Sequence, residues 1–189
     1  MKLTPRIEHA IRKASILHDG QYRKGIGHLP YITHLYSVSL IVSEYTSQED
    51  TVIAALLHDT IEDTSYTVEE LEKDFGSNVK DLVLFVSEDK RVGGEKISWR
   101  SLKEGYIENL KSAPEEALLI SAADKLHNLR SNIVGHKRVG EEYWKRFHEK
   151  KEDYLWFYGE VVSILKNRLE SPIVSELEKE YAQAVEIFV

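Results

Sequence analysis

The segment TVIAALLHDTIED, residues 51–63, carries the strongest structural signal in the chain. From Val52 to Leu57 every residue is apolar, so a helix over this stretch is apolar on all sides, which is typical of a helix buried at the centre of a domain. The character changes abruptly after Leu57. At about 100° per residue, the ionisable residues that follow share one side of the helix: His58, Asp59, Glu62 and Asp63.

The three carboxylates in this group would repel one another, and burying them is costly unless protonation or a cation offsets their charge. A divalent cation is the simplest solution. The alternative is that Glu62 and Asp63 lie at an exposed helix end, since acidic residues are mostly in solvent. We favour a cation site because His58 and Asp59 follow directly on an apolar run.

A second apolar stretch, ALLISAADKLHNLRS at 117–131, also acquires a charge in its middle. Helical geometry places three of its polar residues on one stripe: Asp124, Asn128 and Ser131. Asp124 needs a partner in the core. Ion pairs with Lys125 or Arg130 are not favoured by their helical spacing, and a bridge to another helix remains possible. His127 points about 60° away from Asp124, and we predict that it is a core histidine or supports a ligand, and is not itself a ligand.

A third piece is PYITH at 30–34, which precedes another apolar helical pattern. We predict that Thr33 caps this helix and that His34 lies in its first turn. His34 is one of 8 histidines, and its position alone gives little reason to predict that it binds a metal. The histidines outside these three segments are predicted to be surface or structural residues: His9, His18, His28, His136 and His148.

Apolar spacings of three and four predominate along the rest of the chain, and strand signals are almost absent. Thr67 with Glu70 forms a capping box, and Gly76 marks a helix end. We predict a single all-α, multi-helix domain over residues 1–189. Its predicted helices lie at 4–18, 33–46, 48–63, 67–74, 77–87, 98–111, 114–134, 141–147, 149–168 and 173–187.

Composition excludes several classes of function. The formal net charge of -7 would repel a polyanionic backbone, so we expect no polymeric nucleic-acid partner. The chain has no cysteine, so any metal must bind to His, Asp or Glu. The longest notable apolar run, 52–57, is too short to span a bilayer, and the first residues are not those of a signal peptide. We therefore expect a cytoplasmic protein that does not contact membranes.

Two glycine-bearing stretches, 20–27 and 88–96, are predicted to be loops, and both carry basic residues. The acidic total does not exclude a small anionic ligand, because basic residues can gather locally. The candidates for such a pocket are Arg23-Lys24, Lys90-Arg91, and Lys125 with Arg130.

Taken in order, His34, His58-Asp59 and Asp124 resemble the H…HD…D ligand set of the HD superfamily of metal-dependent phosphohydrolases. The chain is more closely similar to the hydrolase domain of the RelA/SpoT alarmone enzymes and to the small alarmone hydrolases. Matching segments lie at 21–24, 30–34, 54–64, 75–76 and 123–130. The resemblance is strongest over residues 1–135 and leaves 136–189 as C-terminal helices.

This resemblance implies one metal ion, usually manganese in the family, held by His34, His58, Asp59 and Asp124. Two imidazoles and two carboxylates suit Mn²⁺ on general grounds as well, although Fe²⁺, Co²⁺ or Zn²⁺ would also fit. Glu62 and Asp63 resemble the pair that orients or deprotonates the attacking water. The other matches imply substrate contacts. Arg23 and Lys24 match residues that contact the purine base and substrate charge, and positions near the ribose and phosphates are matched by Lys125, Asn128 and Arg130. Ser131, a further implied substrate residue, stands where many relatives have Thr and keeps the hydroxyl.

The implied substrate is a small nucleotide with a 3′-pyrophosphate, such as (p)ppGpp or its adenosine counterpart. Two alternatives keep the same site: a phosphatase for another nucleotide, such as a deoxynucleotide or the 2′-phosphate of NADPH, and a non-catalytic nucleotide sensor. The presence of both Glu62 and Asp63 argues against a sensor. The loop between Arg23 and His34 is about two residues longer than in the large bifunctional enzymes, which leaves the base preference open.

Aromatic residues are dense between Tyr143 and Tyr158. We predict that they form core or a contact in a homo-oligomer, and that they do not stack on a nucleobase. Trp99-Arg100 with Lys103, near the second glycine-bearing loop, is a better candidate for a flap over the substrate.

Overall fold

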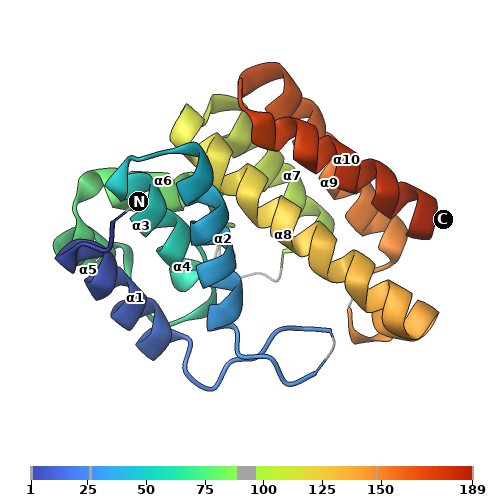
Figure 1. Cartoon of the computed structure of the whole chain (residues 1–189), viewed down its shortest axis with the longest axis horizontal. Coiled ribbons are helices and arrows are strands. Elements are labelled where there is room, and N and C mark those ends of the chain that lie inside the picture. Colours follow the sequence, from blue (N-terminus) through green and yellow to red (C-terminus); the bar gives the residue numbers. More distant parts are fainter. Residues whose placement is uncertain (1, 26, 89–96, 148, 189) are drawn as a thin grey trace.

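Helix α3 (Glu49–Leu57) is buried among the N-terminal helices, as its apolar sequence predicts (Figure 1). Residues 51–57 are all buried, and the helix packs against α1 (Pro5–Leu17), α2 (Ile32–Tyr45), α6 (Ser77–Val86) and α8 (Glu115–Val139). This computed structural model describes residues 2–25, 27–88, 97–147 and 149–188. Within these ranges the chain forms helices and no strand, apart from an isolated bridge between Tyr22 and Pro30, which confirms the all-α prediction.

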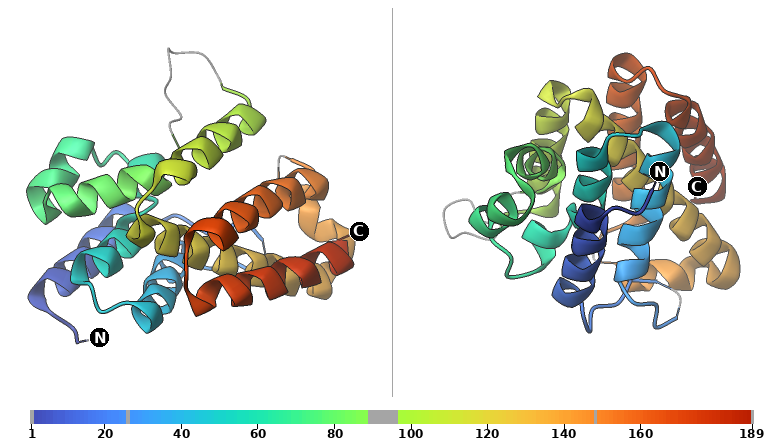
Figure 2. Two further views of the ribbon diagram at one scale, coloured as in Figure 1. Left: turned by 90° about the horizontal axis from the view of Figure 1, so that it is seen from above. Right: turned by 60° about the vertical axis from the view of Figure 1, so that its left-hand side comes forward.

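The long helix α8 runs between the N-terminal helices and the C-terminal pair α9 and α10 (Figures 1 and 2). It packs against α2 on one side and against α9 and α10 on the other. The remaining elements are α4 (Thr60–Asp63), α5 (Val68–Phe75), α7 (Trp99–Ser112), the 3-10 helix η1 (Gly140–Arg146), α9 (Lys151–Arg168) and α10 (Pro172–Phe188). The predicted capping box is present, since the Thr67 side chain accepts from the Glu70 amide and the Glu70 side chain accepts from that of Thr67.

The prediction of one continuous helix over 48–63 is wrong. Helix α3 ends at Leu57, and α4 begins at Thr60 after a turn at His58 and Asp59. The Thr60 hydroxyl donates to the Leu57 carbonyl at 2.6 Å, and a side chain that binds a backbone carbonyl in this way competes with the helical ladder. The Ser87 hydroxyl, on the neighbouring helix end, donates to the His58 carbonyl at 3.3 Å. The turn therefore lies where two candidate metal ligands stand.

Two smaller predictions also need correction. Thr33 does not cap α2, because the helix already includes Ile32 and the Thr33 hydroxyl donates to the Pro30 carbonyl at 2.7 Å. Helix α8 extends to Val139 and not to residue 134, and it ends where Gly140 adopts a φ of 61°. The left-handed conformation at Gly140 costs glycine nothing and redirects the chain into η1.

Gly135 lets the Tyr143 ring approach the backbone of α8. A β-carbon at Gly135 would stand 2.1 Å from Cε2 of Tyr143, which is buried and cannot yield easily. We therefore expect Gly135→Ala to lower the free energy of unfolding by about 1–3 kcal/mol. The matched control is Gly105→Ala in α7, where no atom lies within 4 Å of the new methyl group. That change should raise stability by about 0.5–1 kcal/mol, and urea unfolding curves that move in the same direction for both variants would contradict this packing argument.

Among the residues that the structure describes, no helix is long and apolar enough to cross a bilayer. The second predicted loop falls largely outside the described residues, and so do Lys90-Arg91, Gly93-Gly94 and His148.

Candidate metal centre and substrate cavity

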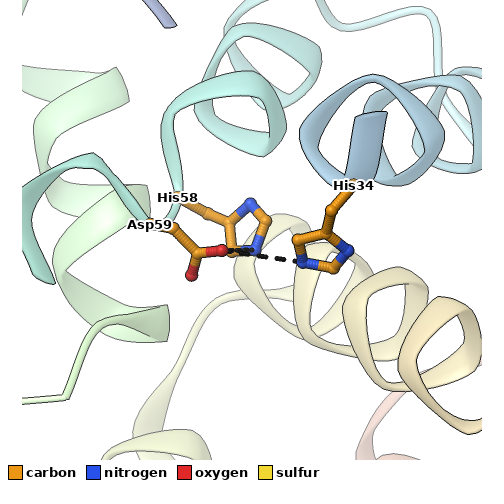
Figure 3. Close-up of side chains that lie close together, drawn as sticks. All are labelled: His34, His58 and Asp59. Atoms are coloured by element: carbon orange, nitrogen blue, oxygen red, sulfur yellow. Dashed lines mark ion pairs between the residues drawn. The ribbon is translucent and has the colours of Figure 1, made fainter. Parts of the chain in front are cut away.

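Four predicted ligands converge from three parts of the chain. His34 comes from the first turn of α2, His58 and Asp59 from the turn between α3 and α4, and Asp124 from α8 (Figure 3 shows the first three). His34 Nε2 lies 3.1 Å from Asp124 Oδ1 and 3.6 Å from Asp59 Oδ2. His58 Nε2 lies 3.2 Å from Asp59 Oδ2 and 3.8 Å from Asp124 Oδ1. Ligands about 2.1 Å from one ion and 90–110° apart are separated by roughly 3.0–3.5 Å, so this spacing suits a shared cation.

His58 is oriented as a metal ligand. Its Nδ1 donates to the Ala55 carbonyl at 2.9 Å, which leaves Nε2 as the atom with a lone pair. That Nε2 is fully buried and has no hydrogen-bond partner of good geometry, although it faces the carboxylates of Asp59 and Asp124. Nε2 is thus the ring atom of His58 that is free to bind a metal, and a divalent cation can take the place of the proton that the carboxylates otherwise favour there.

The electrostatics of the cluster favour positive charge between the two carboxylates. Burial alone would raise the pKa of Asp59 and Asp124, but His58 beside the first and Lys125 beside the second hold both pKa values below the usual range. Burial would likewise lower the pKa of His58, yet the charges of Asp59 and Asp124 outweigh it and raise that pKa well above its ordinary value. A site that stabilises a buried proton in this way also stabilises a metal cation.

Other side chains hold each ligand in place. The Tyr31 hydroxyl donates to Asp59 Oδ2 at 2.7 Å, and the Asn128 amide donates to Asp124 Oδ1 at 2.6 Å. The Nδ1 atoms of His34 and His127 lie 2.8 Å apart. Burial lowers the pKa of His127 to about 4, so its ring is neutral near pH 7 and can accept from His34. The prediction that His127 supports a ligand agrees with this contact.

Lys125 departs from the prediction made for it. We expected no ion pair between Asp124 and its neighbour in sequence, but Lys125 Nζ lies 2.6 Å from Asp124 Oδ2. The Lys125 side chain is buried, and its ammonium group lies 4.4 Å from the centre of the Tyr106 ring and 5.3 Å from that of Phe157. The two rings flank the ammonium group, and the flexible lysine side chain bends back toward the nearest carboxylate.

Tyr31→Phe should weaken metal binding without disturbing the fold. The change removes only the hydroxyl that orients Asp59, and loss of such a supporting hydrogen bond typically costs 10–100-fold in metal affinity, so we expect about a tenfold rise in the metal dissociation constant. Competition with a fluorescent chelator measures it. Tyr36→Phe is the control, because its hydroxyl contacts Ser15 and no candidate ligand. Equal affinities in the two variants would contradict the orienting role.

A cavity of about 430 Å³ opens over the cluster. Its wall includes three of the four candidate ligands, His34, Asp59 and Asp124, together with both candidate proton-handling residues, Glu62 and Asp63. The predicted substrate residues that line it are Arg23, Lys24, Lys125 and Asn128. Arg23 also donates to the Asn128 side chain at 2.6 Å, so one hydrogen-bonded chain links the predicted base-binding loop to Asp124.

Glu62 and Asp63 are both anchored by neighbours. The Glu88 amide donates to Glu62 Oε1 at 2.5 Å, and the Gln21 side chain donates to the Asp63 carbonyl at 2.8 Å. Both residues belong to α4, directly after the turn that carries His58 and Asp59. The turn between α3 and α4 thus places the candidate ligand Asp59 and the candidate proton-handling residues Glu62 and Asp63 at one cavity.

Two predicted substrate residues lie elsewhere. Arg130 forms ion pairs with Glu176 at 2.9 Å and Glu180 at 3.1 Å on α10, and it does not line the cavity. Six residues along a helix place it about 120° from Asp124. Ser131 is also outside the cavity wall, and its hydroxyl donates to the His127 carbonyl at 2.8 Å.

The aromatic region is core, as predicted, but it has a second role that the sequence did not reveal. Tyr143, Trp144, Phe157 and Tyr158 are buried. Phe147, Tyr154, Phe157 and Tyr158 also line the cavity, as do Trp99 and Lys103 of the predicted flap. Aromatic residues at helical spacing look the same in sequence whether they face a core or a cavity, so no local signal could have separated the two.

Comparison with known proteins connects this geometry to a family. An HD domain model matches residues 7–147. The guanosine-3′,5′-bis(diphosphate) 3′-pyrophosphohydrolase MESH1 of Xenopus tropicalis is 36% identical over 162 residues, which cover 85% of this chain and 84% of that protein. The MESH1 protein of Drosophila melanogaster is 40% identical over 158 residues, with 82% of each chain covered. The bifunctional (p)ppGpp synthase/hydrolase SpoT of Escherichia coli is 37% identical over 132 residues, but this chain covers only 18% of it.

A solved structure supports the same grouping. It is described as a metazoan ortholog of SpoT that hydrolyzes ppGpp and plays a role in starvation responses. It superposes with a TM-score of 0.82 at 30% sequence identity, and the match covers 97% of both chains.

Proposed function

The chain belongs to the HD domain family, and on this premise we propose that it hydrolyses the 3′-pyrophosphate of guanosine alarmones such as ppGpp, giving the nucleotide and pyrophosphate. The observation that carries the proposal is the convergence of two histidines and two aspartates at a cavity that is also lined by basic side chains. Relatives similar over most of their length are named for this reaction.

We propose that His34, His58, Asp59 and Asp124 hold one divalent cation, Mn²⁺, since two imidazoles with two carboxylates suit that ion. The chemistry that such a cation supplies is Lewis acidity, which lowers the pKa of water and polarises a phosphoryl oxygen. Tyr31, His127 and Asn128 keep the ligands in the geometry that binding requires.

The proton of the attacking water is assigned to Glu62 and Asp63, which lie at the same cavity and beside the ligands. The ammonium group of Lys125 lies next to Asp124 and neutralises negative charge that develops on the leaving pyrophosphate. Arg23 and Lys24, on the loop before α2, bind the rest of the nucleotide. We assign no substrate contact to Arg130 or Ser131.

The decisive assay is hydrolysis by the purified protein with Mn²⁺. Substrates are the guanosine and adenosine 3′-pyrophosphates, deoxynucleoside triphosphates and NADPH, with products identified by chromatography. Released pyrophosphate from the 3′-pyrophosphates is the expected result. Release of monophosphate from NADPH or another nucleotide would indicate a phosphatase for that nucleotide. Binding of a nucleotide without hydrolysis would indicate a non-catalytic nucleotide sensor.

A further inference from the structure

Lys103, on α7, is a basic side chain of the cavity to which the reaction described above assigns no role. We propose that Lys103 is a second pyrophosphate-binding lysine beside Lys125, and that Glu88 holds it in the free protein until the pyrophosphate group displaces that carboxylate. The inference rests on the proposed function, because it concerns the leaving group of the same reaction.

The position of Lys103 supports this role. It lines the same cavity as Asp124 and Lys125, and only 15% of its side chain is exposed. Its ammonium group lies 4.6 Å from the centre of the Phe157 ring, and that of Lys125 lies 5.3 Å from the same centre. The two nitrogens are therefore at most about 10 Å apart, a span that one diphosphate can bridge with charge-assisted bonds of about 2.8 Å at either end.

Lys103 differs from an ordinary surface lysine of the same helix. Lys111, eight residues along α7, has 55% of its side chain exposed and pairs with Glu108 in solvent. Lys103 instead forms its ion pair with Glu88, whose side chain is only 11% exposed. Two ammonium groups near one aromatic ring repel each other, so the arrangement is stable only when anions accompany both of them.

Glu88 is the carboxylate that pairs with Lys103 in the free protein and that pyrophosphate displaces. Among the residues that the structure describes, five acidic side chains line the cavity. Asp59 and Asp124 are candidate ligands, Glu62 and Asp63 are candidate proton carriers, and Glu88 is the one of these five that has no role assigned so far. The negative charge of Glu88 would repel an anionic substrate, so its presence in this cavity is best explained by its ion pair with Lys103. A diphosphate carries more charge and more acceptor oxygens than one carboxylate, so it can take all three donors of the ammonium group.

The pair also lies close to the site of reaction. The Glu88 amide donates to Glu62 Oε1, while its carboxylate binds Lys103, so a single residue contacts a candidate proton carrier and the proposed phosphate ligand. Lys103 is thus placed toward the leaving pyrophosphate and not toward the far end of the nucleotide.

Calorimetric titration of the Mn²⁺-loaded protein, freed of excess metal, with inorganic pyrophosphate and separately with GDP tests the proposal. Lys103→Gln should raise the dissociation constant of pyrophosphate about tenfold and leave that of GDP within about twofold, because a charge-assisted bond is lost at one end only. Lys103→Arg should recover most of the loss. Lys111→Gln is the matched control and should bind both ligands as the wild type does.

Glu88→Gln should change the dissociation constant of pyrophosphate in the opposite direction. It frees Lys103 and should lower the pyrophosphate dissociation constant about threefold or more, and this gain should vanish in the Lys103→Gln background. A gain that persists in the double variant would mean that Glu88 acts only through general repulsion, and would overturn the proposal. It would also be overturned if Lys103→Gln matched Lys111→Gln, or if it weakened GDP and not pyrophosphate.

Hydrolysis assays on the same samples separate this inference from the proposed function. A wild type that releases pyrophosphate from the guanosine substrate, while Lys103→Gln binds pyrophosphate normally, contradicts only the role of Lys103. A wild type that neither hydrolyses the substrate nor binds pyrophosphate contradicts both. Circular dichroism spectra and metal content that are unchanged in all five variants, the double variant included, establish that the differences arise in the cavity.

Discussion

Replacing His58 with asparagine is expected to abolish stoichiometric metal binding and to lower turnover by at least about 10³-fold. The side-chain amide of asparagine can occupy the place of Nδ1 and keep the hydrogen bond to the Ala55 carbonyl, but it offers nothing at the position of Nε2. The substitution therefore removes one ligand atom while retaining the local backbone contact. Elemental analysis after gel filtration, together with hydrolysis rates, measures both effects.

The control for this change is His9→Asn. His9 is exposed on α1 and has no part in the cluster, so metal content and turnover should equal those of the wild type. A His58→Asn protein that keeps one metal ion per chain would contradict the assignment of His58 as a ligand. If metal and activity were lost together with helical structure, Asp124→Asn would decide, since it keeps the size of the side chain and removes only its charge.

Asp63→Asn is expected to separate metal binding from chemistry. The variant should keep one metal ion per chain, because Asp63 lies on α4 beyond the ligand turn, and it should lower kcat by about 10²–10⁴-fold, the range typical of a lost general base. Asparagine preserves the shape of the side chain and the backbone carbonyl that accepts from Gln21. Metal analysis and steady-state kinetics on one preparation provide the comparison.

Asp81→Asn is the matched control for that variant. Its carboxylate lies on α6, with 58% of the side chain exposed and an ion pair to Lys80, far from any role in the cavity. Loss of metal in Asp63→Asn would contradict the division of roles and would make Asp63 a ligand. If kcat of Asp63→Asn equalled that of Asp81→Asn, Asp63 would have no part in the chemistry, and Glu62 alone would accept the proton of the attacking water.

Local sequence predicts those features that depend on neighbours along the chain. The apolar run 52–57 has no polar face, so its helix can only be stable when buried on all sides. The Thr67–Glu70 capping box needs only a spacing of three residues, and it forms as predicted. The approach of His34, His58, Asp59 and Asp124 was expected from a resemblance to a family, because no rule of periodicity joins residues so far apart.

Tertiary structure decides what depends on neighbours in space. Lys125 reaches Asp124 because the rings of Tyr106 and Phe157 close around it, and Arg130 faces α10 because its position on α8 points away from Asp124. Tyr154, Phe157 and Tyr158 of α9 line the cavity because α9 packs against α8, the helix that carries Asp124.

The turn at His58 and Asp59 depends both on local sequence and on tertiary packing. The order of residues along the chain is enough to predict that charge follows a buried apolar helix and that a cation is the simplest way to balance it. The helix break has a local component, since the Thr60 hydroxyl binds the Leu57 carbonyl three residues back. The contact of Ser87 with the His58 carbonyl at 3.3 Å depends instead on the packing of α6 beside α3. The packing of distant helices against α3 cannot be read from local spacing, because it depends on residues far apart in the chain, and it brings the candidate ligands and Glu62 with Asp63 to one cavity.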